Sequence, residues 1–224
     1  MIVIRDIVAL QDELTGKWHD HPVAEFEELP EGSAGADSGN GRIRLDWLTL
    51  VAHQHRANFE LWHIEDEART PGASDSALAA IKRRIDETNQ VRNDLLEDLD
   101  RVLRNWLEVR DLPNSEAPLH SETPGMIIDR LSILSLKIYH TCEEVGRVHA
   151  PAGHSDRNRE RLAILQKQRR DLAGCLGVLW KEIQDGTRRF ELYHQMKMYN
   201  DPTLNPAIYG KTGDQKTSAR AKKD

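Results

Sequence analysis

The feature of this sequence that most constrains its fold is a set of long stretches in which apolar residues recur every three or four positions, as on one face of a helix. Four long stretches cover about residues 44–69, 76–110, 124–148 and 155–199, and a shorter one covers residues 2–19. No long alternating pattern typical of a strand lies between them. Short connections between long helices favour antiparallel neighbours. We therefore predict an all-α fold, an up-and-down four-helix bundle with an additional N-terminal helix.

Residues that cap or break helices mark the expected boundaries. The predicted N-caps are Ser74, Thr123 and Ser155. The Gly- and Ser-rich composition of residues 27–41 predicts a flexible loop. Residues 211–224 are mostly charged or small, which predicts a disordered tail. We expect residues 1–210 to form a single domain.

Composition argues against several classes of partner. The net charge of −6 and the pI of about 5.9 argue against nucleic acid as the main partner. No apolar run approaches the roughly 18 residues that a membrane span needs. The N-terminus reaches charged residues too soon for a signal peptide. Cys142 and Cys175 lie in apolar helical context, which predicts buried, reduced thiols and a cytoplasmic protein.

Charged or imidazole side chains interrupt the apolar stripe of each long stretch. The candidate ligand-binding residues obtained in this way are His55, His63, Asp66, Asn89, Arg92, Arg130, Lys137, Arg169, His194 and Lys197. Five of them are cations, opposed on the inner face by Asp66 and Glu144, and a buried charge is costly unless it is paired or liganded. Two interpretations stay open: a closed structural network, or a pocket for an anionic small molecule.

Two Glu-x-x-His motifs have the spacing found in di-iron bundles, at Glu60–His63 and Glu191–His194. At about 100° per residue, Glu60 lies roughly 120° and Glu191 about 80° from the centre of its own apolar stripe. Such a site also needs a lone inward Glu on each of the other two helices, and none is found there. The motifs therefore predict no metal and no cofactor. Because no complete catalytic motif is present, an enzymatic activity is neither predicted nor excluded.

Several local motifs resemble an uncharacterised bacterial family of all-helical proteins, known as a domain of unknown function. They are Trp62-His-Ile-Glu-Asp66, Ile85-Asp-Glu-Thr-Asn-Gln-Val-Arg-Asn-Asp-Leu95, Ile128-Asp-Arg-Leu-Ser-Ile-Leu-Ser-Leu-Lys-Ile-Tyr-His140, Lys197-Met-Tyr-Asn-Asp-Pro202 and Leu204-Asn-Pro206. The resemblance covers most of residues 44–210. Genes of the family lie near heptosyltransferase-type glycosyltransferases and cell-surface polysaccharide loci, so the resemblance implies a role in surface-glycan synthesis.

Three functions follow as hypotheses. The leading one is an accessory or anionic-ligand-binding bundle of surface-glycan synthesis. The second is an enzyme acting on a phosphorylated or carboxylated small molecule, such as a sugar phosphate. Both predict a concave pocket lined by Arg92, Arg130 and Lys137. The third is a structural partner of a glycosyltransferase, which predicts an exposed apolar helix face.

Overall fold

The computed structural model describes residues 3–21, 40–194, 196 and 203–206, with backbone alone for residues 40–46. It divides the chain into two units, Met1–Leu192 and Tyr193–Asp224, which are described separately. The predicted tail at 211–224 and most of the predicted loop at 27–41 lie outside the described residues.

The first unit is built from helices. They are α1 (Ile4–Asp20), α2 (Asn40–Glu67), α3 (Asp75–Glu108), α4 (Pro124–Gly146) and α5 (His154–Gln184). Within the described ranges there is no strand, and a single isolated bridge joins Leu119 and Arg189. The prediction of an all-α fold is confirmed. The first turn of α2 takes up Asn40 and Gly41, which the sequence placed in the loop.

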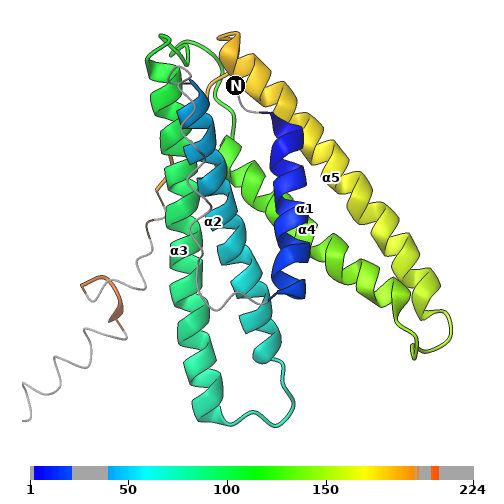
Figure 1. Cartoon of the computed structure of the whole chain (residues 1–224). Helices are drawn as coiled ribbons and strands as arrows, with labels where there is room; N and C mark the ends of the chain where they lie inside the picture. Colours follow the sequence, from blue (N-terminus) through cyan, green and yellow to red (C-terminus); the bar gives the residue numbers. More distant parts are fainter. Residues whose placement is uncertain (1–2, 22–39, 195, 197–202, 207–224) are drawn as a thin grey trace, which may run out of the picture. The chain divides into compact units, whose positions relative to one another are not determined.

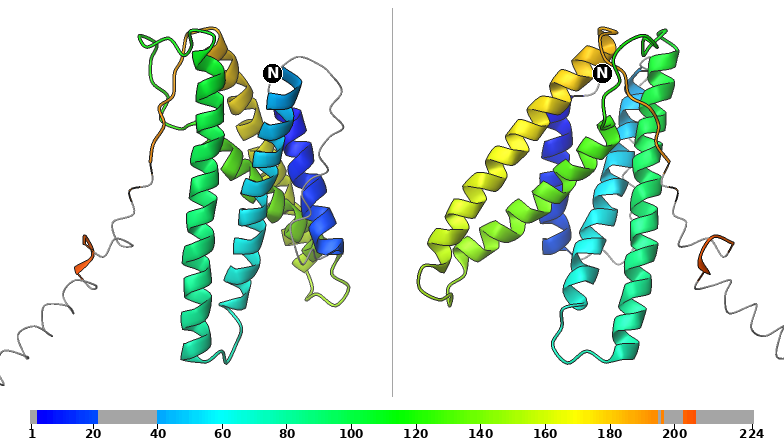
Figure 2. Two further views of the ribbon diagram at one scale, coloured as in Figure 1. Left: turned by 60° about the vertical axis from the view of Figure 1, so that its left-hand side comes forward. Right: turned by 180° about the vertical axis from the view of Figure 1, so that it is seen from behind.

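The helices form two antiparallel hairpins, α2–α3 and α4–α5, with α1 between α2 and α5 (Figures 1 and 2). Helix α1 packs against α2, α4 and α5, and α4 also packs against α2 and α3. The hydrophobic core where these helices meet includes Ile7, Val51, Leu99, Leu131 and Ile183, each fully buried. This is the predicted four-helix bundle with an extra N-terminal helix.

Local capping explains where two of the helices begin. The Ser74 hydroxyl accepts a hydrogen bond from the amide of Ala77 at 3.3 Å, and the Thr123 hydroxyl accepts one from Met126 at 3.2 Å. Both N-caps agree with the sequence prediction. The predicted cap at Ser155 is wrong, because α5 begins one residue earlier and the Ser155 hydroxyl donates instead to the carbonyl of Val145 at 2.9 Å.

The last helix is shorter than its periodicity predicts. Helix α5 ends at Gln184, whereas the apolar pattern predicts a helix to about Tyr199. Gly186 has a φ of 70°, which a left-handed turn requires, and its amide donates to the carbonyl of Ile183 at 3.1 Å. Residues 187–192 after this turn are not helical, yet Phe190 is fully buried in the core. Phe190 therefore continues the apolar pattern without continuing the helix.

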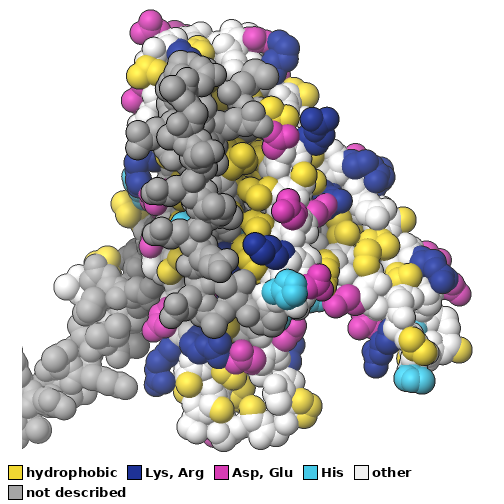
Figure 3. Space-filling model, viewed as in Figure 1, with side chains coloured by type: hydrophobic (Ala, Val, Ile, Leu, Met, Phe, Trp, Pro, Cys, Tyr) yellow, Lys and Arg dark blue, Asp and Glu magenta, His cyan; other side chains and the backbone are white. Residues whose placement is uncertain are grey.

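The surface is highly charged. Lys and Arg side chains lie interspersed with Asp and Glu over the face shown in Figure 3. Cys142 and Cys175 are free thiols but exposed, so the prediction that they are buried is wrong. Among the described helices, none combines the length and the apolarity that a membrane span requires.

Candidate metal centre

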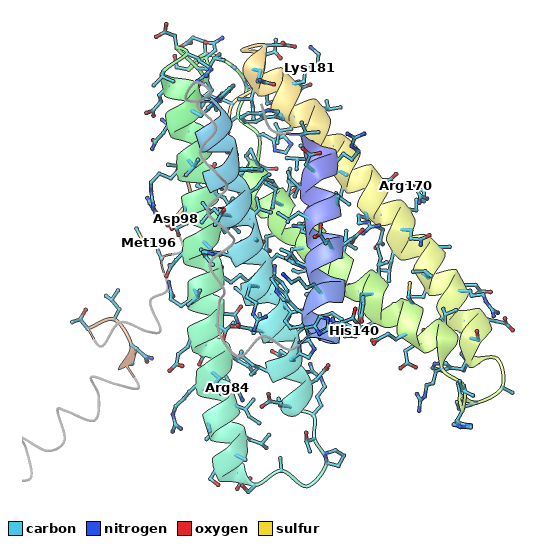
Figure 4. The ribbon with its side chains drawn as sticks, viewed as in Figure 1. Arg84, Asp98, His140, Arg170, Lys181 and Met196 are labelled. Atoms are coloured by element: carbon cyan, nitrogen blue, oxygen red, sulfur yellow. The ribbon has the colours of Figure 1, made fainter. Side chains whose placement is uncertain are left out.

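Three histidines from three helices meet near the C-terminal end of α1. They are His19 of α1, His63 of α2 and His140 of α4, and one ring nitrogen of each lies within 4.8 Å of the others. Their ring centroids are 4.9 to 5.9 Å apart. Figure 4 shows His140 beside the lower end of α1 and next to α2.

Hydrogen bonds set the tautomer of each ring, that is, which nitrogen carries the proton. The Nδ1 atoms of His19 and His63 lie 2.7 and 2.8 Å from the carbonyl oxygens of Thr15 and Phe59. The Nδ1 atom of His140 lies 2.8 Å from the Glu143 carboxylate. Because these oxygens only accept, each Nδ1 carries the proton and donates it. In this tautomer the lone pair of each ring lies on Nε2.

Two of the three Nε2 atoms make no hydrogen bond within the described part of the chain. Those of His19 and His140 are buried and have no hydrogen-bonding partner in the described part of the chain. Burial lowers the pKa of His19, and the neighbouring His140 and His63 lower it further. With Nδ1 as the donor, the Nε2 lone pairs of His19 and His140 are therefore free. Neutral imidazole with a second-shell acceptor on the other nitrogen is the usual form of a histidine metal ligand.

Aromatic side chains hold these rings in place. Tyr139 stacks on His19 with centroids 4.2 Å apart, and Trp62 stacks on His140 at 4.8 Å. Phe59 lies 4.4 Å from His63 by ring centroids. Stacking restricts ring rotation, so the three imidazoles are positioned before any ligand binds.

The sequence analysis found one of the three members. His63 was identified from the α2 stripe, whereas His19 lay in no motif and His140 appeared only as the last residue of the Ile128–His140 motif, with no role assigned to it. The prediction of no metal rested on the Glu-x-x-His motifs and did not consider this cluster. Glu60 is exposed, as its helical phase predicts, and it pairs with Arg56. Glu191 lies outside any helix, so the phase argument made for it does not hold.

A buried polar network lies beside the histidine cluster and is centred on Asp129 of α4. Its carboxylate accepts two hydrogen bonds from Arg92 of α3, one of them from Nε at 2.8 Å. Gln54 and Asn58 of α2 donate to the same carboxylate at 2.5 and 2.9 Å. The bond to Asp129 is the main cause that raises the pKa of Arg92. The charge of Arg92 is therefore fully compensated within the bundle.

The network continues through His55 to a second ion pair. The two ring nitrogens of His55 lie 2.7 Å from Ser132 Oγ and 2.9 Å from Thr15 Oγ1. The hydroxyl of Ser135 donates to Asp12 at 2.6 Å, and Asp12 also pairs with Arg169 at 2.5 Å. Four of these groups are almost completely buried, namely His55, Thr15, Ser132 and Ser135. This arrangement matches the interpretation of a closed structural network.

The structure separates the predicted site residues into three groups. His55, Arg92 and Arg169 belong to the network, Asn89 lies 3.5 Å from Arg92, and His63 belongs to the histidine cluster. Asp66, Arg130 and Lys137 are exposed, so their predicted inward orientation is wrong. Arg130 pairs with Glu122, because the face of α4 that carries it turns to solvent. His194 is exposed in the second unit, and Lys197 lies outside the described residues.

A pocket of about 360 Å³ adjoins the histidine cluster. It lies between α2 and α3, and its lining includes Arg56, Phe59 and His63 from α2 with Arg84 and Thr88 from α3. The predicted lining by Arg92, Arg130 and Lys137 is not found in this pocket. His63 is common to the pocket and the cluster, and Phe59 in the pocket lining packs against His63.

The fold and these sites define an all-helical bundle with a buried polar network and a three-histidine cluster. Comparison with protein-family models matches residues 48–192 to the family described as a protein of unknown function, DUF4254. The chain belongs to this family, which confirms the resemblance to an uncharacterised domain. The matched residues include His63 and His140, while His19 precedes them. No curated protein and no solved structure matches the chain.

Proposed function

We propose that this protein binds a divalent transition metal ion through His19, His63 and His140 and uses the metal to bind an anionic small molecule. The observation that supports this most directly is the convergence of three imidazoles whose Nδ1 protons are already engaged by acceptors. Imidazole nitrogen suits zinc, copper, iron and nickel. Three protein ligands also leave one position of a four-coordinate ion for an exogenous group.

Small ring rotations complete the coordination. A tetrahedral zinc ion with Zn–N bonds of about 2.0–2.1 Å holds its ligand nitrogens about 3.4 Å apart. The three nitrogens lie within 4.8 Å of one another without a metal. A bound zinc ion would therefore need the rings to close by roughly an ångström, and the acceptors on Nδ1 would keep their tautomers fixed.

An anionic ligand is the leading hypothesis of the sequence analysis, and we keep it but place the binding site at the metal instead of among the inner arginines and lysines. Arg92 and Arg169 are committed to Asp129 and Asp12, so a metal ion is the better source of positive charge. The implied link to surface-glycan synthesis suggests sugar phosphates and nucleotide sugars as first candidates. The open coordination position also favours the second hypothesis, an enzyme in which the metal polarises a phosphoryl or carbonyl oxygen.

The hypothesis of a glycosyltransferase partner receives less support. Helix α5 exposes Ile164 and Val178, fourteen residues apart on one face. Asp171 lies midway between them and pairs with Lys167. This face is therefore not a continuous apolar patch.

Metal titration of the full chain, prepared without a polyhistidine tag, tests the proposal. We expect about one Co²⁺ or Zn²⁺ per chain, detected by cobalt absorption and by elemental analysis after dialysis. His63→Gln and His140→Gln should each weaken binding by at least tenfold. The matched control is His149→Gln, which changes an exposed histidine outside the cluster and should leave binding unchanged. Equal metal binding by all four proteins, or none by the wild type, overturns the proposal.

A further inference from the structure

We propose that the anion binds in the pocket between α2 and α3, where Arg56 is its principal ligand, and that its affinity depends on the metal at His63. This inference rests on the proposed function and names the place and chemical class of the ligand. His63 contributes both to the pocket wall and to the histidine cluster. A molecule in the pocket therefore lies against the same imidazole that we propose to bind the metal.

The guanidinium of Arg56 is suited to bind an oxyanion. Its Nε donates to Glu60 at 2.8 Å, while its two terminal nitrogens make no hydrogen bond to another described residue. The guanidinium carbon lies 5.1 Å from the Trp18 ring centroid and 5.4 Å from that of Phe59. The Arg56 side chain is only 18% exposed. These contacts hold a planar donor fork in place, and such a fork matches carboxylate and phosphate in two parallel hydrogen bonds.

The second arginine of the pocket is already occupied. Both terminal nitrogens of Arg84 donate to the carboxylate of Glu67, and the Arg84 side chain is 49% exposed. Arg84 therefore has fewer free hydrogen-bond donors for an incoming anion. This difference makes Arg84 a matched internal control for Arg56, because the two residues have the same chemistry and line the same pocket.

The charge of the pocket makes anion binding depend on the metal. Arg56 and Arg84 are balanced by Glu60 and Glu87 in the same lining. A divalent ion at the adjoining cluster changes this neutral surface to a net positive one, and the attraction is little screened by salt where the site is partly buried. Linkage then requires that the anion raise the affinity for metal by the same factor by which the metal raises the affinity for anion.

The volume limits the size of the ligand. A pocket of about 360 Å³ is at the small end of the range for small-molecule sites. It suits one phosphate or carboxylate group with a short organic portion, such as a sugar phosphate, and is too small for a folded partner. The ligand class is therefore a small oxyanion.

Titration with sulfate, a tetrahedral dianion that binds free zinc weakly, tests this inference. Calorimetry would compare the zinc-loaded and metal-free full chain, with sodium chloride at equal ionic strength as the blank. We expect sulfate to bind the zinc form at least tenfold more tightly, and saturating sulfate to raise zinc affinity by the same factor. Arg56→Gln should weaken sulfate binding at least tenfold, and Arg84→Gln by less than threefold, with zinc affinity in the absence of sulfate unchanged in both.

The outcomes are separable from those of the proposed function. If the wild type binds no zinc, the proposed function fails and this inference fails with it. If zinc binds but sulfate affinity is the same with and without it, or the same in Arg56→Gln, only this inference is overturned. Circular dichroism verifies folding, and Arg56→Lys, which keeps the charge but not the fork, should lie between wild type and Arg56→Gln.

Discussion

His55 and Thr15 form a buried hydrogen bond in which the direction of donation is determined. The His55 Nε2 atom lies 2.9 Å from Thr15 Oγ1, and the Thr15 hydroxyl gives its own proton to the carbonyl of Gln11 at 2.8 Å. His55 must therefore donate from Nε2 and accept from Ser132 at Nδ1. A proton on Nδ1 would require the Ser132 hydroxyl to turn and accept instead of donate, so these donations favour the neutral imidazole.

The pH dependence of stability should report this preference for an uncharged His55 ring. Burial lowers the pKa of His55 to about 3, from the ordinary value of 6.5. Below pH 6.5 His55 takes up a proton in the unfolded chain but not in the folded chain. Its contribution to the free energy of unfolding is therefore fully present above that pH and is lost as the pH falls. We expect His55 to contribute a loss of about 2–3 kcal/mol between pH 7 and pH 4.5. Urea unfolding of wild type and His55→Gln at both pH values measures it, and identical pH dependence in the two proteins would contradict it.

Arg92 should be far more important to stability than an exposed arginine. Arg92→Ala leaves the buried Asp129 carboxylate without its main partner, and we expect a loss of about 3 kcal/mol in the free energy of unfolding. Arg130→Ala is the matched control, because its pair with Glu122 is exposed and should be worth less than about 1 kcal/mol. Chemical denaturation of both variants compares them, and similar losses would count against the network.

Asp100 should act on stability with the opposite sign to His55. It is buried, and this raises its pKa to about 6 despite hydrogen bonds from Thr123 and from the Gly125 amide at 2.7 Å. The folded chain holds the proton more tightly than the unfolded chain, so stability falls as pH rises from 3.8 to about 6. Asp100→Asn does not titrate and should gain about 2–3 kcal/mol relative to wild type over this window. Thermal melts at pH 4 and pH 7 check it, and a constant difference between the two proteins would refute it.

Gly125 should tolerate no side chain. A Cβ atom at this position would lie 2.8 Å from the Asp100 carboxylate, which is buried and held by a hydrogen bond from the Gly125 amide. Gly125→Ala should therefore cost about 1–3 kcal/mol. Gly174→Ala on α5 meets nothing within 4 Å and should stabilise the protein by about 0.5–1 kcal/mol, the gain expected from replacing glycine inside a helix. Melting temperatures that shift in the same direction would disprove the packing argument.

If the metal site is present, its second shell should be measurable. The Glu143 carboxylate orients His140, and Glu143→Gln should weaken zinc binding by about 10- to 100-fold. The next residue supplies the control, because Glu144 bonds His154 outside the cluster, and Glu144→Gln should leave zinc affinity unchanged. Competition with a chromophoric chelator measures both affinities. Equal effects of the two substitutions would rule out a second-shell role for Glu143.

The sequence alone determined the parts of the fold that depend on local interactions. Apolar periodicity located the helices, and Ser74 and Thr123 marked where two of them begin. Helical phase also identified Arg92 and His55 as inward residues, because a side chain's direction depends on its position along its own helix. The same reasoning failed for Lys137, which is exposed although its helix is apolar on most faces, because periodicity alone does not show which side a neighbouring helix covers.

The tertiary structure decided which residues meet. Asp129 is the partner of Arg92 because α4 packs against both α2 and α3, and the periodicity of α4 carries no information about that distance. His19, His63 and His140 come together because the C-terminal ends of α1 and α2 lie beside the C-terminal part of α4, which depends on how the helices are offset along their axes. Helix α5 ends at Gln184 because Phe190 reaches the core from beyond the turn at Gly186. Periodicity records which side chains are buried, whereas packing between distant segments determines their partners.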